Sequence, residues 1–362
     1  MRWEPPGRGL PRVAKGAWLG APALCVIALV ATLQAGSATA RTAGQESSRA
    51  TTLVDTRDLS SEERRFTGWP IAARPPFRPK RTIIVKTARG FYRAWWRLRA
   101  GDKVMVRGVV FSGNVKLWDK ELPAWAEIHF ANDVRFLGGG TPGSYALSIG
   151  NVSKVRLYGG DVTNPNGHSF RIEDSSDVLW WGFRSHDSAG GCGGAFGITK
   201  PTDRLDIRGE MWNCGQDLSL DPHTLEPGTG LHGFYLGGGK YRTSGTFILK
   251  VHDQPAGAAV QIGPYTQDST LEVDARRISF QARIQVAGNA VQWWGNGIRN
   301  VRVRYLYGED LAGRVSDTEG LYDGDNPPGA IVIEYGRSAG TIRLAPKYAP
   351  ADDGSVQYLD CR

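Results

Sequence analysis

The chain has 362 residues, of which 41% are hydrophobic; this is enough for a sizeable core and excludes disorder throughout. Its 47 glycines and 12 tryptophans, against three methionines, favour short strands joined by tight turns and indicate an all-β fold. A formal net charge of +8 is a mild basic bias that suits acidic partners such as uronate polysaccharides or teichoic acids. No nucleic-acid-binding motif is recognisable, so we expect no nucleic-acid partner.

The first 40 residues have the plan of a signal peptide. Basic residues at positions 2, 8, 12 and 15 precede an apolar run, 17–33, and Ala38-Thr39-Ala40 offers small residues for cleavage. We expect residues 1–40 to be removed and the protein to be secreted or held at the cell surface, with no membrane segment afterwards. The alternative is an uncleaved anchor, since the apolar run is only slightly shorter than a spanning helix.

Two further segments precede the main body of the chain. Residues 41–80 are rich in Ser, Thr, Arg and Pro without a sustained apolar period, which is typical of a linker or flexible arm. Residues 81–127 are expected to form an N-terminal cap. Within it, Phe91, Trp95 and Leu98 recur at the i, i+4 and i+7 positions, which predicts one short amphipathic capping helix.

From residue 128 onward, apolar-x-apolar triplets alternate with turn residues. Successive coils begin with the triplets at 147–149, 170–172, 196–198, 234–236, 260–262, 291–293 and 331–333. Their shorter spacings, 23 and 26 residues, match a β-solenoid, whereas a propeller blade needs about 40 residues and a sandwich needs longer strands. We therefore predict a parallel β-helix over 128–345 and a C-terminal tail over 346–362, with inserted loops where the spacing is longer.

The cysteines fit this coil length. Cys192 and Cys214 are 22 residues apart, so they should lie on neighbouring coils within reach of a disulfide. The alternative is a pair of buried thiols. Cys361 is left as a free thiol or as a partner for an intermolecular bridge.

The coil pattern, the run 100–104 (Ala-Gly-Asp-Lys-Val) after the capping helix, and Trp212-Asn-Cys-Gly215 leading to His232-Gly-Phe-Tyr-Leu236 carry a resemblance. Together they resemble exported proteins of the pectin-lyase-like superfamily, over roughly residues 83–344. This resemblance implies a single-stranded right-handed parallel β-helix. It leaves the activity open, because that superfamily includes polysaccharide lyases, glycoside hydrolases, uronate epimerases and members without known catalysis.

In a β-helix the middle residue of each triplet points outward, because side chains alternate along a strand. The first triplets then give an outward column of Ser148, Arg171, Gly197, Tyr235, Gln261 and Gln292. A second column holds Gly150, Glu173, Thr199, Gly237, Gly263 and Trp294, with Lys200 beside it. Glycines between hydrogen-bonding residues predict a shallow trough for an extended sugar chain, with Tyr235 or Trp294 as a stacking platform. The alternative is an ordinary solvated sheet face.

Lyase or epimerase chemistry on a uronate needs a base, a cation for the carboxylate and a proton donor. We predict His232 as the base (with His223 as the alternative), Arg171 and Lys200 as cations and Tyr235 as donor. The other substrate-binding candidates are Glu173, Asp221, His223, Gln261, Gln292 and Trp294. For His232 the competing interpretation is a ring that caps backbone groups at the entrance of its strand.

The motifs of individual activities are weaker. Asp221-Pro222-His223 is similar to the core of the alginate C5-epimerases, but the residues on either side differ from that family's pattern. The carboxylate motifs of β-helical polygalacturonases are missing from the coils, which disfavours glycoside hydrolysis. No cofactor is signalled; Ca²⁺ remains open, because Glu173, Asp174 and Asp187 lie close in the pattern without forming an acidic cluster.

The sequence therefore predicts an exported, monomeric carbohydrate-active β-helix protein that binds an acidic polysaccharide. β-Elimination and epimerisation are the reactions to test. A non-catalytic cell-envelope or adhesion module is the first alternative, and a glycoside hydrolase is the second.

Overall fold

The computed structural model describes residues 76–139, 142–216, 231–279, 288–321, 330–334, 336–342 and 356–358. All of them belong to one compact unit, Val54–Arg362. The predicted signal peptide and most of the predicted arm lie outside the described residues. So do Asp221, His223 and Cys361, and the predictions made for these positions stay predictions.

The strands wind into coils with three walls, and every pair of named strands in the described part of the chain is parallel. Wall A consists of the first parts of β4 (Val115–Phe130) and β6 (Tyr145–Tyr158), then β8 (His168–Glu173), β10 (Gly193–Phe196), β12 (Phe234–Leu236), β14 (Val260–Ile262), β16 (Val291–Gly295) and β18 (Ser316–Leu321).

Walls B and C share several long strands that bend between them. Wall B consists of β1 (Arg81–Val85), β2 (Asp102–Val106), the last parts of β4 and β6, the first parts of β9 (Ser176–Ser188), β11 (Thr202–Cys214), β13 (Thr243–Gln254), β15 (Thr266–Ile278) and β17 (Arg299–Leu311), then β19 (Ile331–Ile333) and β21 (Val356–Tyr358). Wall C consists of β3 (Val110–Ser112), β5 (Arg135–Leu137), β7 (Asp161–Thr163), the last parts of β9, β11, β13, β15 and β17, and β20 (Gly336–Ile342).

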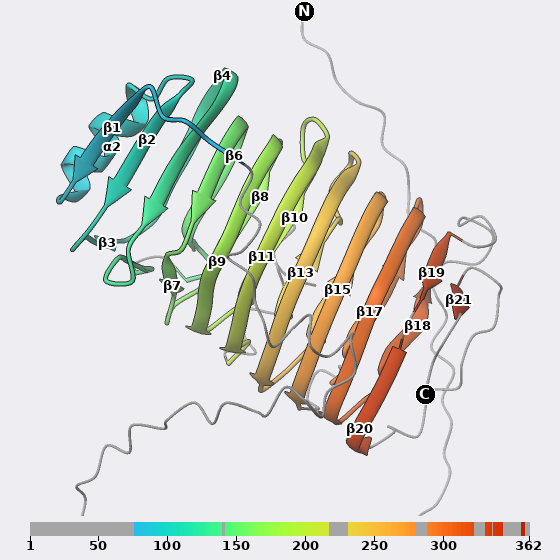
Figure 1. Ribbon diagram of the computed structural model, residues 1–362. Coiled ribbons are helices and arrows are strands. Elements are labelled where there is room, and N and C mark those ends of the chain that lie inside the picture. Colours follow the sequence, from blue (N-terminus) through green and yellow to red (C-terminus); the bar gives the residue numbers. More distant parts are fainter. Residues whose placement is uncertain are drawn as a thin grey trace, which may run out of the picture. The chain divides into compact units, whose positions relative to one another are not determined.

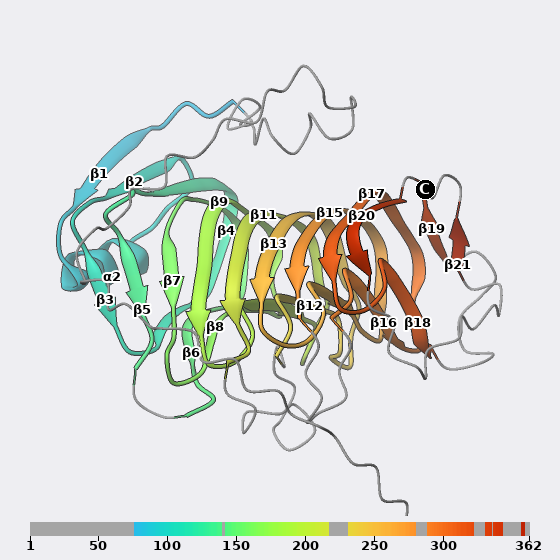
Figure 2. The same cartoon turned by 90° about the horizontal axis from the view of Figure 1, so that it is seen from below.

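The predicted parallel β-helix is confirmed. Figure 1 shows the coils stacked in chain order from β1 to β21. Figure 2 shows β8, β12 and β16 of wall A along one side of the coils, with β1 and β2 of wall B on the other. Walls A and B therefore present two separate outer surfaces.

The core lies inside the coils because alternate residues of each strand point inward. In β12, Phe234 and Leu236 are completely buried while Tyr235 between them is partly exposed. Inward residues of successive coils also stack on one another, as in the parallel rings of Phe111 and Phe136, whose centroids are 4.8 Å apart. Each coil thus completes the core of its neighbours, as expected for a solenoid.

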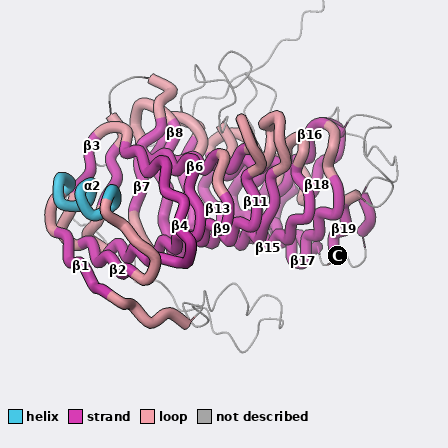
Figure 3. Tube along the Cα trace, turned by 90° about the horizontal axis from the view of Figure 1, so that it is seen from above, coloured by secondary structure: helices cyan, strands magenta, loops and turns pink. Residues whose placement is uncertain are grey.

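Helix α2 (Ala88–Trp96) is the predicted capping helix. It begins after Thr87, whose Oγ1 accepts a hydrogen bond from the Gly90 N–H at 3.1 Å. Its buried residue Phe91 packs edge-on against Phe111 at 5.1 Å, and Trp95 is buried beside it. Figure 3 shows α2 at the end of the coils beside β1 and β3. Parallel pairing already begins with β1 and β2, inside the segment that we predicted as the cap.

The corners of the coils use left-handed backbone conformations, which Asn and Asp adopt more readily than other non-glycine residues. Asp187, Asn213 and Asp253 have φ near 50° and follow the wall C parts of their strands. The Asn213 side-chain amide donates to Asp187 across the coils at 2.5 Å. Hydrogen bonds of this kind hold equivalent corners in register.

Candidate functional site

One outward residue per coil lines wall A in register. We call this line the A row; its members are Lys116, Ser148, Arg171, Gly194, Tyr235, Gln261 and Gln292. Neighbouring members are about 4.8 Å apart because that is the spacing of hydrogen-bonded strands. The A row contains the predicted outward column, with one correction.

Gly194, not Gly197, is the member of the A row between Arg171 and Tyr235. Gly193 of β10 pairs with Phe234, and Gly194 pairs with Tyr235. Gly193 points inward, where a Cβ would come within 2.3 Å of the Phe170 ring, so the phenylalanine of the preceding coil fills the space. The apolar-x-apolar rule missed this strand, since a glycine stands at its first inward position.

The second predicted column changes at the same coil. Glu173 pairs with Gly150 on one side and with Phe196, not Thr199, on the other. The Thr199 backbone and hydroxyl instead donate to Asp174, which also accepts the N–H groups of Ile198 and Lys200. These hydrogen bonds outweigh burial and hold the pKa of Asp174 below its usual value.

The cationic end of the A row is built around Arg171. Its guanidinium lies 3.1 Å from the Glu173 carboxylate and 4.8 Å from the centre of the Tyr145 ring. Burial raises the pKa of Glu173, although Arg171 partly opposes this shift. Among the described residues, neither the Arg171 Nε nor the Oγ of the fully buried Ser148 has a hydrogen-bond partner. Both atoms are buried, so a ligand at this end would meet the partly exposed guanidinium of Arg171 and not these two atoms.

Tyr235 occupies the middle of the A row in a space kept open by glycines. A Cβ on Gly263 would lie 2.8 Å from the Tyr235 hydroxyl, and a Cβ on Gly238 would lie 2.7 Å from it. The Phe196 ring packs edge-on against Tyr235 at 5.6 Å, and the His232 ring centre is 6.2 Å away. The structure thus brings together the predicted pair Tyr235 and His232.

His232 and His168 occupy equivalent places, two residues before the inward phenylalanine of their strands. The Nδ1 atom of His232 accepts the Ala258 N–H at 2.9 Å, and that of His168 accepts the Gly191 N–H at 3.0 Å. Each hydrogen bond places the proton of a neutral imidazole on Nε2. The backbone-capping interpretation of His232 therefore describes its contacts, and its use as a base stays a prediction.

Lys200 points away from this pair. Its ammonium group donates to Glu121 at 3.1 Å and to the Asn151 side chain. Lys200 follows β10, whereas His232 precedes β12, so the two lie at opposite ends of the wall A strands. Of the two predicted cations, Arg171 is the one within the A row.

The A row ends in two amide side chains, and the register of wall A then continues to Asp317 of β18. Gln261 pairs with Tyr235 and with Gln292 on successive coils. The buried Oε1 of Gln292 has no hydrogen-bond partner among the described residues. Trp294, two residues further along β16, is exposed at the edge of wall A. These predicted substrate-binding residues therefore lie on the predicted surface, but their use stays a prediction.

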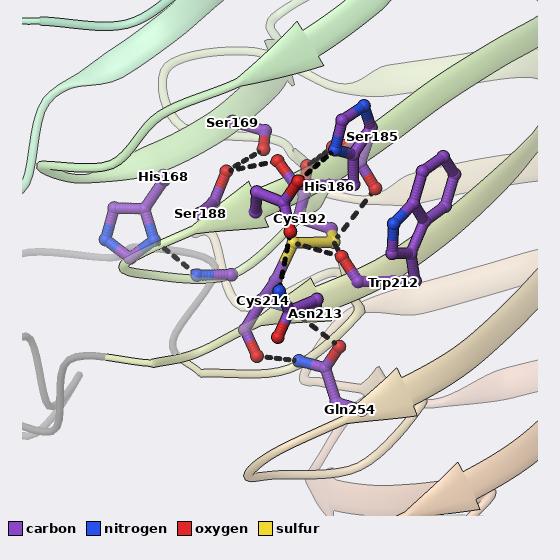
Figure 4. Close-up of a disulfide and its surroundings, with 12 residues drawn as sticks. His168, Ser169, Ser185, His186, Ser188, Cys192, Trp212, Asn213, Cys214 and Gln254 are labelled. Atoms are coloured by element: carbon purple, nitrogen blue, oxygen red, sulfur yellow. Dashed lines mark hydrogen bonds and ion pairs between the residues drawn. A yellow bond between two sulfur atoms is a disulfide. The ribbon is translucent and has the colours of Figure 1, made fainter. Parts of the chain in front are cut away.

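The inserted loop after β11 starts and ends at well-anchored positions. Cys192 and Cys214, the pair indicated by the coil length, form a disulfide with a Cα–Cα distance of 5.4 Å. The buried Gln254 amide donates to the carbonyls of Cys214 at 2.6 Å and of Leu231 at 3.0 Å. Figure 4 shows the disulfide between neighbouring coils, with Gln254 beside Cys214 and His168 nearby.

In the described part of the chain, no group of three or more His, Cys, Asp or Glu side chains is arranged to hold a metal ion. Whether the protein uses Ca²⁺ stays open.

Within the same residues, no helix combines the length and the apolar character needed to cross a membrane.

No family model matches the chain, and no curated protein matches it by sequence. Two solved structures are similar. The alginate lyase from Paenibacillus sp. str. FPU-7 is 16% identical with a TM-score of 0.52, over 76% of this chain and 99% of that one. The chain shares the parallel β-helix fold of this enzyme. The pectate lyase Pel9A is 10% identical with a TM-score of 0.49, over 76% of this chain and 80% of that one.

Proposed function

We propose that the chain binds an acidic polysaccharide along the A row. The observation that carries this proposal is the A row itself, one outward residue per coil with Lys116 and Arg171 at one end and amide side chains at the other. The partly exposed guanidinium of Arg171 favours a ligand with anionic oxygens. The similar Paenibacillus enzyme is an alginate lyase, which agrees with this ligand class.

The A row also offers a place for β-elimination. Gly194 lacks a side chain between Arg171 and Tyr235, which are two coils and therefore about 10 Å apart at the backbone. A uronate ring above Gly194 would direct its carboxylate to Arg171 and its other side to the Tyr235 hydroxyl. In the reaction, a base removes the proton from C5, the C4–O bond breaks, a C4=C5 double bond forms and the departing oxygen takes a proton.

In this scheme the Tyr235 phenolate oxygen removes the C5 proton and then returns it to the departing oxygen, while the Arg171 guanidinium stabilises the negative charge that develops at the carboxylate. The neutral ring of His232 is held by the Ala258 N–H and lies beside Tyr235, which it helps to position. Lys200 has no role in this scheme, because it lies at the opposite end of the wall A strands from His232. We further propose that the protein acts as an exported monomer.

The binding test compares Arg171→Ala with Arg299→Ala, which removes the same charge from an exposed position outside the A row. We expect Arg171→Ala to weaken the binding of alginate and polygalacturonate about tenfold or more, because a hydrogen bond to a charged group contributes about 1.5–3 kcal/mol. Titration calorimetry measures the effect. Equal affinities of the two variants, or a preference for neutral glycans, would contradict the proposal.

The reaction test follows the ultraviolet absorbance of unsaturated uronates. Tyr235→Phe keeps the ring between Phe196 and the glycines but removes the hydroxyl. If Tyr235 transfers the proton, we expect turnover to fall about a hundredfold or more with little change in binding. Binding without product from any acidic glycan would leave the non-catalytic binding module as the function.

A further inference from the structure

The cap segment carries positive charge that is mostly without salt bridges among the described residues. Residues 76–101 contain eight basic side chains and no acid, the basic residues being Arg78, Lys80, Arg81, Lys86, Arg89, Arg93, Arg97 and Arg99. In the described part of the chain, Arg81 alone among the eight forms a salt bridge, with Asp102 at 2.6 Å. On the later coils several arginines are paired, as Arg184 is with Asp161. This contrast marks the cap as a surface for an anionic partner.

A cavity lies within this charged segment. It has a volume of about 440 Å³ and is lined by Arg81, Trp96, Arg97, Leu98 and Arg99, between the start of β1 and the end of α2. The Trp96 side chain is exposed, at 61% of its maximum. Arginines suit carboxylates geometrically, and an exposed indole offers a flat apolar surface, so the lining combines the two features that an acidic sugar needs.

The cavity connects with the cationic end of the A row. Lys120 donates to the Trp96 carbonyl at 3.1 Å, and its ammonium group is 5.9 Å from the centre of the Trp96 ring. The Trp95 indole donates to the Trp118 carbonyl at 3.3 Å, and the Trp118 ring is 6.0 Å from the ammonium group of Lys116. Cations and aromatic rings therefore continue from the first member of the A row to the cap.

We propose that this cap cavity is a second binding subsite for the same acidic polysaccharide. A polymer that extends beyond Lys116 would continue over Lys120, place carboxylates at Arg97 and Arg99, and rest a sugar ring on Trp96. The proposal rests on the A row as the main polysaccharide site. It adds that affinity depends on polymer length, because short oligomers end before the cap.

The test compares two double variants that remove the same charge. One alters residues just after helix α2, and the other alters residues within it. Arg97→Ala/Arg99→Ala alters the cavity lining, whereas Arg89→Ala/Arg93→Ala alters exposed residues outside it. Each protein is titrated with polymeric polyuronate and with a uronate tetrasaccharide. We expect the cavity variant to weaken polymer binding about tenfold while tetrasaccharide binding is unchanged, and the control to change both less than about twofold.

Several outcomes would overturn the inference. Equal weakening by both double variants would indicate general electrostatic attraction, and unchanged polymer binding by the cavity variant would show that the cavity is not used. Arg171→Ala separates the two proposals: if only the cavity variant loses polymer binding, the A row proposal fails and the cap subsite survives. If the unaltered protein binds no polyuronate but binds anionic phospholipid vesicles through Arg97 and Arg99, the cavity is a lipid site and the polysaccharide inference is wrong.

Discussion

His168, the first residue of β8 in wall A, is a single side chain that makes the stability of the fold depend on pH. Its ring is buried, stacks on Tyr145 at 5.1 Å and accepts a backbone hydrogen bond from Gly191. Burial lowers the pKa of His168 to about 4 from its usual 6.5. His168 therefore binds a proton at a lower pH in the folded protein than in the unfolded chain.

The sign of this effect gives a prediction. Because the folded pKa is lower than the unfolded one, the stabilisation is complete above pH 6.5 and is lost as the pH falls toward 4. We expect His168→Asn, whose Oδ1 can still accept the Gly191 N–H, to remove about 2 kcal/mol of the loss between neutral pH and pH 4.5. Urea unfolding at neutral pH and near pH 4.5 measures it in both proteins. An unchanged difference between the two pH values would contradict the assignment.

For single residues, the sequence contains patterns that predict the role of some side chains and none for others. His168 stands two residues before Phe170, as His232 does before Phe234, and that shared offset was a usable signal for a common capping role. No comparable sequence pattern marks Gly193 as an inward residue. Its place is explained by the size of Phe170 on the preceding coil, a contact between residues that an apolar-x-apolar pattern does not register. Likewise, nothing in the pattern shows that Lys200 pairs with Glu121.

At the scale of elements, neighbouring coils are joined by more than the strand ladder. The rings of His186, Trp212 and His252 are stacked, with centroids 4.2 and 5.5 Å apart and planes within 5° of parallel. Each histidine also contacts the aspartate that follows it, at 2.7 Å. Both His-Asp pairs lie near the ends of β9 and β13.

The disulfide adds a covalent link between β10 and β11, and its removal gives a prediction. Cys192→Ala/Cys214→Ala releases a loop of 22 residues, which should lower the free energy of unfolding by about 3 kcal/mol because the unfolded chain gains freedom. Chemical denaturation with and without reductant measures the change. A reductant should destabilise the unaltered protein by the same amount and leave the variant unaffected; a reductant effect on the variant would argue against the disulfide as its source.

Some of the elements could be predicted from short sequence patterns. The stripe of Phe91, Trp95 and Leu98 predicted α2, because three buried residues at helical spacing leave few alternatives for so short a segment. The early coils around β1 and β2 were assigned to the cap instead, since their irregular spacing hides the parallel pairing. Pairing between distant segments is set by stacking on the next coil, which a local pattern does not contain.

On the scale of the whole molecule, a solenoid is stabilised by contacts between adjacent coils, so damage at one place has local effects. Trp95 closes the first coils: its ring is buried against the core, and its indole N–H bonds to Trp118. Trp293 occupies a comparably buried position on β16. The two tryptophans thus form a matched pair near opposite ends.

We expect either tryptophan replaced by alanine to cost about 3–5 kcal/mol, with the damage confined to its own end. Hydrogen exchange should show faster exchange in β1, β2 and β4 for Trp95→Ala, and in β14, β16 and β17 for Trp293→Ala. A uniform increase across all coils in either variant would show that the β-helix unfolds as one cooperative unit.

Along each strand of wall A, residues that pack the core alternate with residues that face outward. Phe170 and Ile172 secure the coil, while Arg171 between them touches the outer surface. Substitutions at Arg171, Gln261 or Gln292 can therefore accumulate without repacking the interior. The outer surface of such a chain can change one position at a time while the architecture of the coils stays constant, which is how one fold can carry different functions.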